Sequence, residues 1–191
     1  MSTTVCELIK KKGKRLVVDK GEEIFTQGNS DSGTYFLETG LLKAYYPLPD
    51  GREYVKSFVE PGGLICSINA SYKKSFCTFN LFALKPSLVF EYPYEAILEE
   101  TNRSPAIAED LIEKLTQVFL KKELREYEFL CLSAEERYEI LIDKQPNLID
   151  EVSQLDIARY LGITPVGLSR IKKRVESKIR LLKPLNQAQP Q

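Results

Sequence analysis

Short clusters of apolar residues, separated by turn-forming residues, fill the chain from residue 14 to residue 94. The clusters are LVV (16–18), EIF (23–25), TYFLE (34–38), LLKAYY (41–46), YVKSFV (54–59) and SLVFEY (87–92). Clusters of this length bounded by Gly, Pro, Asn and Asp are typical of β-strands. Gly40, Gly51 and Gly62 follow each other at intervals of eleven residues, which favours a small barrel or roll. Asp50-Gly51 in particular predicts a hairpin with a type I′ turn.

At Pro105 the spacing of apolar residues becomes helical. From 105 to 132 the chain has no Gly and no second Pro, and apolar residues recur three or four positions apart, at Ala108, Leu111, Leu115 and Val118. This spacing predicts one long helix with an apolar face. Such a helix has surface left over beside the roll, so we expect Leu111, Leu115 and Val118 to form a dimer interface. Simple packing against the roll is the alternative.

A separate helical region is expected after the long helix. Ser133 and Glu136 have the spacing of a capping box, in which Ser is the N-cap and Glu is the third helical residue. A new helix is therefore predicted from there through Ile142. Gln145 and Pro146 should end it, because the residue before a proline disfavours helical backbone.

The segment 153–175, SQLDIARYLGITPVGLSRIKKRV, predicts two short helices joined by a tight turn. Ser153 can cap the first helix, and Gly162 can end it in the left-handed conformation. Thr164 and Pro165 can open the second helix as its N-cap and first residue.

The apolar residues of these two helices have the spacing of a helix-turn-helix. Ala158 is small where the helices would cross, and Leu168 lies ten residues later, where it would fill the angle between them. The outward face of the second helix is then polar and basic. In a helix-turn-helix this second helix enters the DNA major groove, so DNA binding is the leading interpretation. A purely structural helical hairpin is the alternative.

Charge divides the chain into two parts although its total is zero. The whole chain has 27 basic and 27 acidic residues. Residues 151–191 contain eight basic and three acidic residues, a net charge of +5, and residues 1–150 carry the matching −5. A basic tip on an acidic body is suited to a polyanion, although a basic tail alone is often only a solvated face.

The residues on which enzymes and metal sites rely are scarce. The chain has no His, which excludes catalysis through imidazole. Its four cysteines, Cys6, Cys66, Cys77 and Cys131, form no C-x-x-C pair and are expected to be buried reduced thiols. No carboxylate pair, activated nucleophile or phosphate-cradling loop stands out. We therefore expect no catalytic residue, no metal site, no cofactor and no enzyme.

The N-terminal residues, MSTTVCELIKKKGKR, lack the apolar segment of a signal peptide. No stretch approaches the roughly 18 apolar residues that span a membrane. A cytoplasmic location without a membrane partner is expected.

The order of these features resembles the Crp/Fnr superfamily of bacterial transcription regulators. The resemblance covers nearly the whole chain and rests on the glycines of the roll, on YFLETGLLKAYYPLPDGREYVKSF, on the long helix and on IARYLGITPVGLSRIKK. It implies an α+β fold with an antiparallel β-roll, similar to a cyclic-nucleotide-binding jelly roll, at 1–104. A dimerisation helix at 105–132 and a helix-turn-helix domain at 133–191 would follow.

The resemblance also implies which residues contact DNA: Thr164, Ser169, Arg170, Lys173 and Arg174. Arg170 matches an arginine that family members commonly have in the recognition helix, and a guanidinium suits O6 and N7 of guanine. Lys173 and Arg174 suit backbone phosphates. Pro165 and Val166 stand where the family commonly has an Arg-Glu pair, so the other base contacts differ.

Two features of the second helix leave alternatives open. Gly167 costs about 1 kcal/mol relative to Ala inside a helix. Either a close approach of DNA to the backbone or a loosely formed first turn would explain it. The sequence after Arg174 shows no obvious hairpin, and the presence of the wing that many family members carry stays open.

An effector pocket is predicted in the roll at Gly62, Gly63, Ser67, Cys77 and Thr78. In members that bind cyclic AMP, the matching segment carries acidic residues and an Arg-Ser or Arg-Thr pair on the phosphate. Here Gly63 and Ser67 replace the acidic residues, and Cys77 and Thr78 replace the pair. Without the arginine a cyclic phosphate loses its charge-assisted partner, so cyclic AMP is not the expected effector. The scattered cysteines and the lack of His exclude the cluster and haem that other members bind.

We therefore predict a homodimeric DNA-binding transcription regulator that is not controlled by cyclic AMP. Its partners would be double-stranded DNA and a second copy of the chain, while a small-molecule effector and RNA polymerase stay open as further partners. The alternative is a small-molecule-binding β-roll module whose helical C-terminus mediates protein association. An exposed basic face at Arg170, Lys173 and Arg174 distinguishes the two.

Overall fold

The structure is a computed structural model that describes residues 4–182. The chain divides into two compact units, Met1–Lys121 and Lys122–Gln191. Helix α4 (Pro105–Cys131) is continuous, and its first turns belong to the first unit and its last turns to the second. Residues 183–191 of the predicted helix-turn-helix domain lie outside the described residues.

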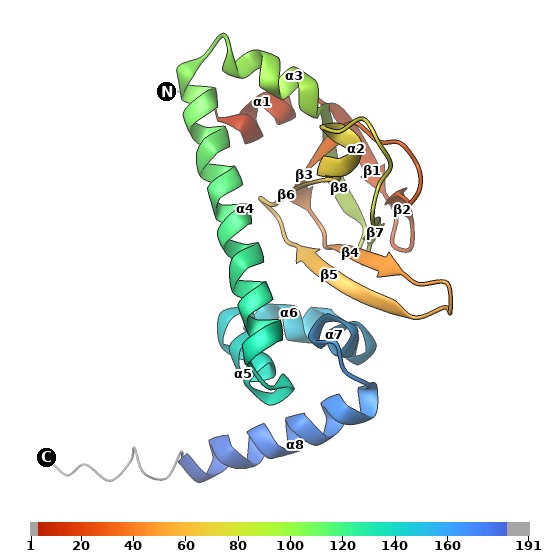
Figure 1. Cartoon of the computed structure of the whole chain (residues 1–191), viewed down its shortest axis with the longest axis vertical. Coiled ribbons are helices and arrows are strands. Elements are labelled where there is room, and N and C mark those ends of the chain that lie inside the picture. Colours follow the sequence, from red (N-terminus) through yellow and green to blue (C-terminus); the bar gives the residue numbers. More distant parts are fainter. Residues whose placement is uncertain (1–3, 183–191) are drawn as a thin grey trace, which may run out of the picture. The chain divides into compact units, whose positions relative to one another are not determined.

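The first unit is an antiparallel β-roll of two four-stranded sheets (Figure 1). One sheet has the order β1-β8-β3-β6 and the other β2-β7-β4-β5. The strands are β1 (Lys14–Val18), β2 (Glu23–Phe25), β3 (Gly33–Thr39), β4 (Leu42–Pro47), β5 (Glu53–Val59), β6 (Leu64–Cys66), β7 (Asn80–Ala83) and β8 (Ser87–Pro93). Each of the six predicted apolar clusters lies in a strand, and the α+β fold class is confirmed. The short strands β6 and β7 were not predicted.

The two sheets enclose one apolar core. Leu37, Leu42, Leu81 and Val89 come from four strands and are fully buried in it. Each such side chain contributes about 1.5–3 kcal/mol by leaving water. Burial of these side chains between the two sheets holds the sheets together.

The hairpin between β4 and β5 is confirmed, but its predicted turn type is wrong. The backbone amide of Gly51 donates to the carbonyl of Leu48 at 3.0 Å, and the amide of Leu48 donates to Arg52 at 2.8 Å. Within this described loop a positive φ, +81°, occurs at Gly51 and not at Asp50. A type I′ turn needs positive φ at both central residues. The loop is instead a type I turn with Pro49 and Asp50 at its centre, followed by a left-handed glycine.

Three helices accompany the roll: α1 (Val5–Lys12), α2 (Ile68–Ser71) and α3 (Tyr94–Thr101). Helix α1 begins at a capping box formed by Thr4 and Glu7. A second apolar cluster joins α1, α3, β3 and the first turns of α4, through Val5, Leu8, Ile9, Phe36, Ile97, Ile107 and Leu111. The start of α4 is therefore part of the folded first unit.

Helix α4 has the predicted length, but its apolar residues divide differently. Leu111 is 9% exposed and packs in the cluster around α1. It is therefore buried within its own chain and does not form the dimer contact that the sequence predicts for it. Leu115 and Val118 are exposed. Ile112 and Phe119, which were not predicted, are 64% and 67% exposed. Ile112, Leu115 and Phe119 follow a three- and four-residue spacing, which places them on one side of the helix.

The cysteines differ in accessibility. Cys77 is buried, Cys6 and Cys66 are partly buried, and Cys131 at the end of α4 is exposed. The expectation of four buried thiols is wrong for Cys131. Its position at the end of an exposed helical stretch is the physical reason.

The second unit continues with four helices in its described part: α5 (Ala134–Lys144), α6 (Pro146–Glu151), α7 (Gln154–Leu161) and α8 (Pro165–Leu182). The capping box predicted for α5 is present, with both Ser133 and Glu136 hydrogen-bonded as expected. The sequence does not predict the short helix α6, because Gln145-Pro146 indicates the end of a helix, whereas Pro146 here also begins the next one. Pro is well suited to a first helical position, where its missing amide is not needed.

Candidate nucleic-acid interface

Helices α7 and α8 form the predicted helix-turn-helix. Ser153 accepts a hydrogen bond from the amide of Asp156 at the start of α7. Gly162 ends α7 in the left-handed conformation with φ +69°. The amide of Ile163 then donates to Ala158 at 3.0 Å, which closes the turn. The chain therefore passes from α7 into α8 within three residues.

The inner faces of α7 and α8 pack together as the spacing predicts. Ala158 is fully buried, and Leu168 is 1% exposed. Ile157, Leu161 and Ile171 are buried around them. The hydrogen bond from Lys172 to Gln154, 3.0 Å long, joins the two helices at their edge. This packing fixes which face of α8 looks outward.

The first turn of α8 is well formed. The hydroxyl of Thr164 accepts a hydrogen bond from the amide of Gly167 at 3.1 Å, and the carbonyl of Thr164 accepts one from Leu168 at 2.9 Å. A loose first turn therefore does not explain Gly167. A methyl group added at Gly167 would lie 3.3 Å from the Thr164 hydroxyl, so the space beside this glycine is limited.

The outward side of α8 presents the predicted base-contacting and phosphate-contacting residues together. Ser169, Arg170 and Lys173 are exposed and lie opposite the buried residues of the helix. Val166 belongs to the same side and is 62% exposed. An apolar side chain in this place suits the methyl group of thymine. The sequence pattern alone shows Val166 only as a departure from the family, and its exposure makes it a candidate for such a contact.

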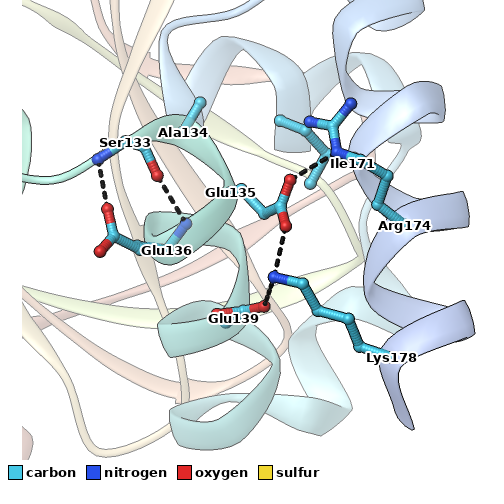
Figure 2. Close-up of a pocket in the computed structure, with 8 residues that line it drawn as sticks. All are labelled: Ser133, Ala134, Glu135, Glu136, Glu139, Ile171, Arg174 and Lys178. Atoms are coloured by element: carbon cyan, nitrogen blue, oxygen red, sulfur yellow. Dashed lines mark hydrogen bonds and ion pairs between the residues drawn. The ribbon is translucent and has the colours of Figure 1, made fainter. Parts of the chain in front are cut away.

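Arg174 lies on the flank of α8 that faces α5, apart from this outward side. Its Nε lies 2.5 Å from Oε2 of Glu135, as Figure 2 shows. Lys178, one turn later, contacts Glu135 and Glu139. The predicted phosphate contact of Arg174 therefore competes with a carboxylate of its own chain.

Helix α8 continues beyond these residues. Within the part of the chain that the structure describes, the helix runs to Leu182 without a hairpin after Arg174. A wing is therefore absent up to that residue.

The residues of the predicted effector pocket are only partly brought together. Ser67 and Cys77 are buried in the roll, whereas Gly62 and Thr78 lie at the surface. Gly62 and Gly63 exchange backbone hydrogen bonds with Leu37, which ties the turn before β6 to β3. Burial raises the pKa of the Cys77 thiol. Cys77 is thus a neutral core residue and no substitute for an arginine on a phosphate.

Two buried hydroxyl groups lie in or directly after strands of the roll. Among the described residues, the side-chain oxygens of Thr34 and Ser67 are buried without a hydrogen-bond partner. Thr34 pairs across the sheet with Cys66, the residue before Ser67. Buried polar atoms without a partner are rare. Thr34 gave no signal in the sequence, because nothing in a strand pattern tells a bonded threonine from an unbonded one.

Comparison with known proteins agrees with this architecture. Residues 15–104 match the family model of the cyclic nucleotide-binding domain. The fumarate and nitrate reduction regulatory protein of Vibrio cholerae is 26% identical over 176 residues, which cover 83% of this chain and 67% of that protein. The nitrogen fixation regulation protein FixK of Bradyrhizobium diazoefficiens is 26% identical over 172 residues, covering 86% and 72%. The chain is thus similar over most of its length to regulators of the Crp/Fnr superfamily.

Solved structures show the same fold. FixK2 from Bradyrhizobium japonicum superposes with a TM-score of 0.74 at 18% identity, covering 87% of this chain and 85% of that one. A mutant of CooA from Carboxydothermus hydrogenoformans gives 0.72 at 13% identity, covering 93% and 86%. The arrangement of a roll, a long helix and a C-terminal helical unit is thus that of Crp/Fnr structures. The relatives named above are regulatory proteins. Within residues 4–182, no helix has the length and apolar character needed to cross a membrane.

Proposed function

We propose that the chain is a homodimeric transcription regulator of the Crp/Fnr superfamily that binds double-stranded DNA through α8. The observation that carries the proposal is the outward side of α8, where Ser169, Arg170 and Lys173 are exposed on a helix held by a helix-turn-helix. Arg170 reads guanine, and Lys173 contacts a phosphate. The site of action is the cytoplasm, where the DNA is.

The homodimer is supported by the exposed apolar side of α4. Ile112, Leu115 and Phe119 would otherwise expose large side chains to water along one side of the helix. Two copies of the helix packed along this side would bury them. The dimer would then bind a roughly palindromic site with half-sites about 34 Å apart.

Independence from cyclic AMP is supported by the interior of the roll. A cyclic phosphate needs a charged partner, and the position matched to the arginine holds the buried neutral Cys77. RNA polymerase is the partner expected of a regulator bound beside a promoter.

The test is a binding titration of the full chain on DNA from upstream of its own gene. Fluorescence anisotropy should show tight binding to one palindromic segment and weak binding to a scrambled one. Arg170→Ala should cost about 1–3 kcal/mol and relax the preference at one base of each half-site. Titration calorimetry with cyclic AMP should show no heat of binding.

Unchanged affinity and unchanged base preference in Arg170→Ala would contradict the assignment of α8 as the recognition helix. Failure of the wild type to prefer any upstream segment would favour the alternative, in which the helical unit associates with protein. A heat of binding with cyclic AMP would contradict the proposed independence from that nucleotide.

A further inference from the structure

Four charged side chains form one ion-pair group on the flank of α8 that faces α5 (Figure 2). Glu135 accepts from both cations: its Oε2 lies 2.5 Å from Arg174 Nε, and its Oε1 lies 2.5 Å from Lys178 Nζ. Glu139 lies 3.2 Å from Lys178 Nζ. The group lines an open groove of about 500 Å³. We call Glu135, Glu139, Arg174 and Lys178 the charged groove.

The acidic residues of 122–150 cancel most of the positive charge of residues 151–191. Residues 122–191 contain 12 basic and 11 acidic residues, a net charge of +1, although residues 151–191 alone carry +5. A nearly neutral unit exerts little long-range attraction on DNA. Glu135 and Glu139 are the acidic residues in direct contact with the cations of α8 on this flank.

Arg174 and Lys178 are close to the predicted DNA-binding side but not free to use their charge there. Arg174 directly follows Lys173, which is exposed. A backbone phosphate could bind Arg174 only by drawing it away from Glu135. Binding of DNA without regard to sequence depends almost entirely on such phosphate contacts. A carboxylate that holds two cations therefore removes two candidate contacts from that kind of binding.

We propose that Glu135, assisted by Glu139, withholds Arg174 and Lys178 from DNA phosphates and so limits the non-specific affinity of the regulator for DNA. Glu135 is a positioning residue in this role, because it acts through the two cations and does not touch DNA. The inference rests on the proposed function, since it assumes that α8 binds DNA.

The first experiment compares the salt dependence of wild type and Glu135→Gln on a DNA duplex that lacks the specific site. Each phosphate contact contributes about 0.9 to the slope of log K against log salt. Glu135→Gln should steepen the slope by about that amount for each cation released in each protomer. Over a fourfold change in salt this is about a 3.5-fold change in affinity per cation. Glu139→Gln, which leaves Arg174 and Lys178 paired with Glu135, should give a smaller increase.

The second experiment tests whether the steeper salt dependence of Glu135→Gln depends on Arg174. Arg174→Gln alone should leave the slope of the wild type unchanged, because that cation is already withheld. In the Glu135→Gln background, Arg174→Gln should remove the part of the increase in slope that comes from Arg174. A purely structural ion pair would give no such dependence on background. Glu139→Gln also serves where Glu135→Gln lowers the melting temperature, since Glu139 lies outside the first turn of α5.

The matched control is Glu99→Gln, which removes one negative charge at an exposed position of α3. It should leave the slope unchanged if the effect is local. An equal increase in Glu99→Gln would assign the effect to net charge and overturn the proposal. Wild-type DNA binding with an unchanged slope in Glu135→Gln and Glu139→Gln would overturn it while leaving the proposed function intact. A wild type that binds no DNA would overturn both.

Discussion

Arg137 of α5 donates a hydrogen bond from Nη2 to the backbone carbonyl of Leu161, the last residue of α7, at 3.1 Å. Its Nη1 donates to the carbonyl of Leu132, just after α4, at 2.7 Å. Carbonyls at the C-terminal ends of helices lack partners within the helix. A cation is also favoured there by the helix dipole. One guanidinium therefore holds the ends of two helices beside the turn of the helix-turn-helix.

Replacing Arg137 by Met should lower the free energy of unfolding of the second unit by about 3 kcal/mol. Hydrogen bonds that involve a charged group are worth about 1.5–3 kcal/mol each, and the carbonyls would lose their donor. Urea denaturation followed by the helical signal in circular dichroism measures the loss. Arg103→Met, at an exposed residue paired with Glu100, is the control and should change stability by less than about 1 kcal/mol. Equal losses of stability in the two variants would contradict a specific role of the Arg137 hydrogen bonds in stabilising the second unit.

Gly162 is a second point at which the turn is constrained. Its φ of +69° disfavours any residue with a side chain, and an added methyl group would lie 3.0 Å from the ring of Phe129. Gly162→Ala should therefore cost about 1–2 kcal/mol from the backbone alone, with a further cost from the ring.

Gly167→Ala is the matched comparison, because Gly167 lies inside α8. The helix propensity of Ala favours this variant by about 1 kcal/mol, against a close approach to the Thr164 hydroxyl. In melting curves, Gly162→Ala should therefore lower the melting temperature, whereas Gly167→Ala should raise it or lower it by clearly less. If Gly167→Ala keeps its stability but loses DNA affinity, DNA approaches the backbone at that residue.

The features predicted well from the sequence are those set by local chemistry. The capping box at Ser133 and the left-handed Gly162 depend on a few neighbouring residues, and both are present. The helix-turn-helix was predictable because its spacing combines a small residue, a glycine and an apolar plug within eleven positions. The hairpin at Gly51 was recognised, but Pro49 in the loop changed its type, since proline suits the first central position of a type I turn.

The features that were missed depend on contacts between distant residues. Leu111 and Leu115 look alike in the sequence, and only the position of α1 decides that Leu111 is buried and Leu115 is exposed. Arg174 and Arg170 are both basic residues of α8, and the carboxylate of Glu135 distinguishes them across 39 positions of sequence. The residue types within one segment contain no information about which residues from distant parts of the chain pack against that segment.

This difference between Leu111 and Leu115 can be tested directly. Leu115→Asp places a charge on the exposed side of α4 and should shift the protein from dimer to monomer in sedimentation velocity, with little change in the folding of the roll. Leu111→Ala should instead leave the dimer in place and lower the free energy of unfolding by about 2–5 kcal/mol, because it opens a cavity in the core around α1. Val17→Asp, on an exposed position of β1, is the control for an added charge. Dimers that persist in Leu115→Asp would exclude this side of α4 as the interface.

Acid should loosen the start of α5 before it affects the rest of the second unit. Lys178 and Arg174 lower the pKa of Glu135 below its ordinary value of 4.5. Ser133 lowers the pKa of Glu136 through the capping box. A carboxyl group with a lowered pKa in the folded state contributes stability that is present above its unfolded pKa and lost as pH falls through the folded value. The contribution of Glu135 and Glu136 should therefore be intact at pH 7 and disappear below about pH 4.5.

Hydrogen exchange of residues 134–144 is the appropriate measurement, because carboxyl groups with lowered pKa also occur in the first unit at Asp50 and Glu100. Protection of this segment, after correction for the intrinsic effect of pH, should fall between pH 5 and pH 3. In a Glu135→Gln/Glu136→Gln variant the protection should be lower at pH 7 and change less with acid, since the titrating groups are gone. The same acid dependence in the variant would mean that other groups control the stability of α5, and that its contacts with Arg174 and Lys178 do not.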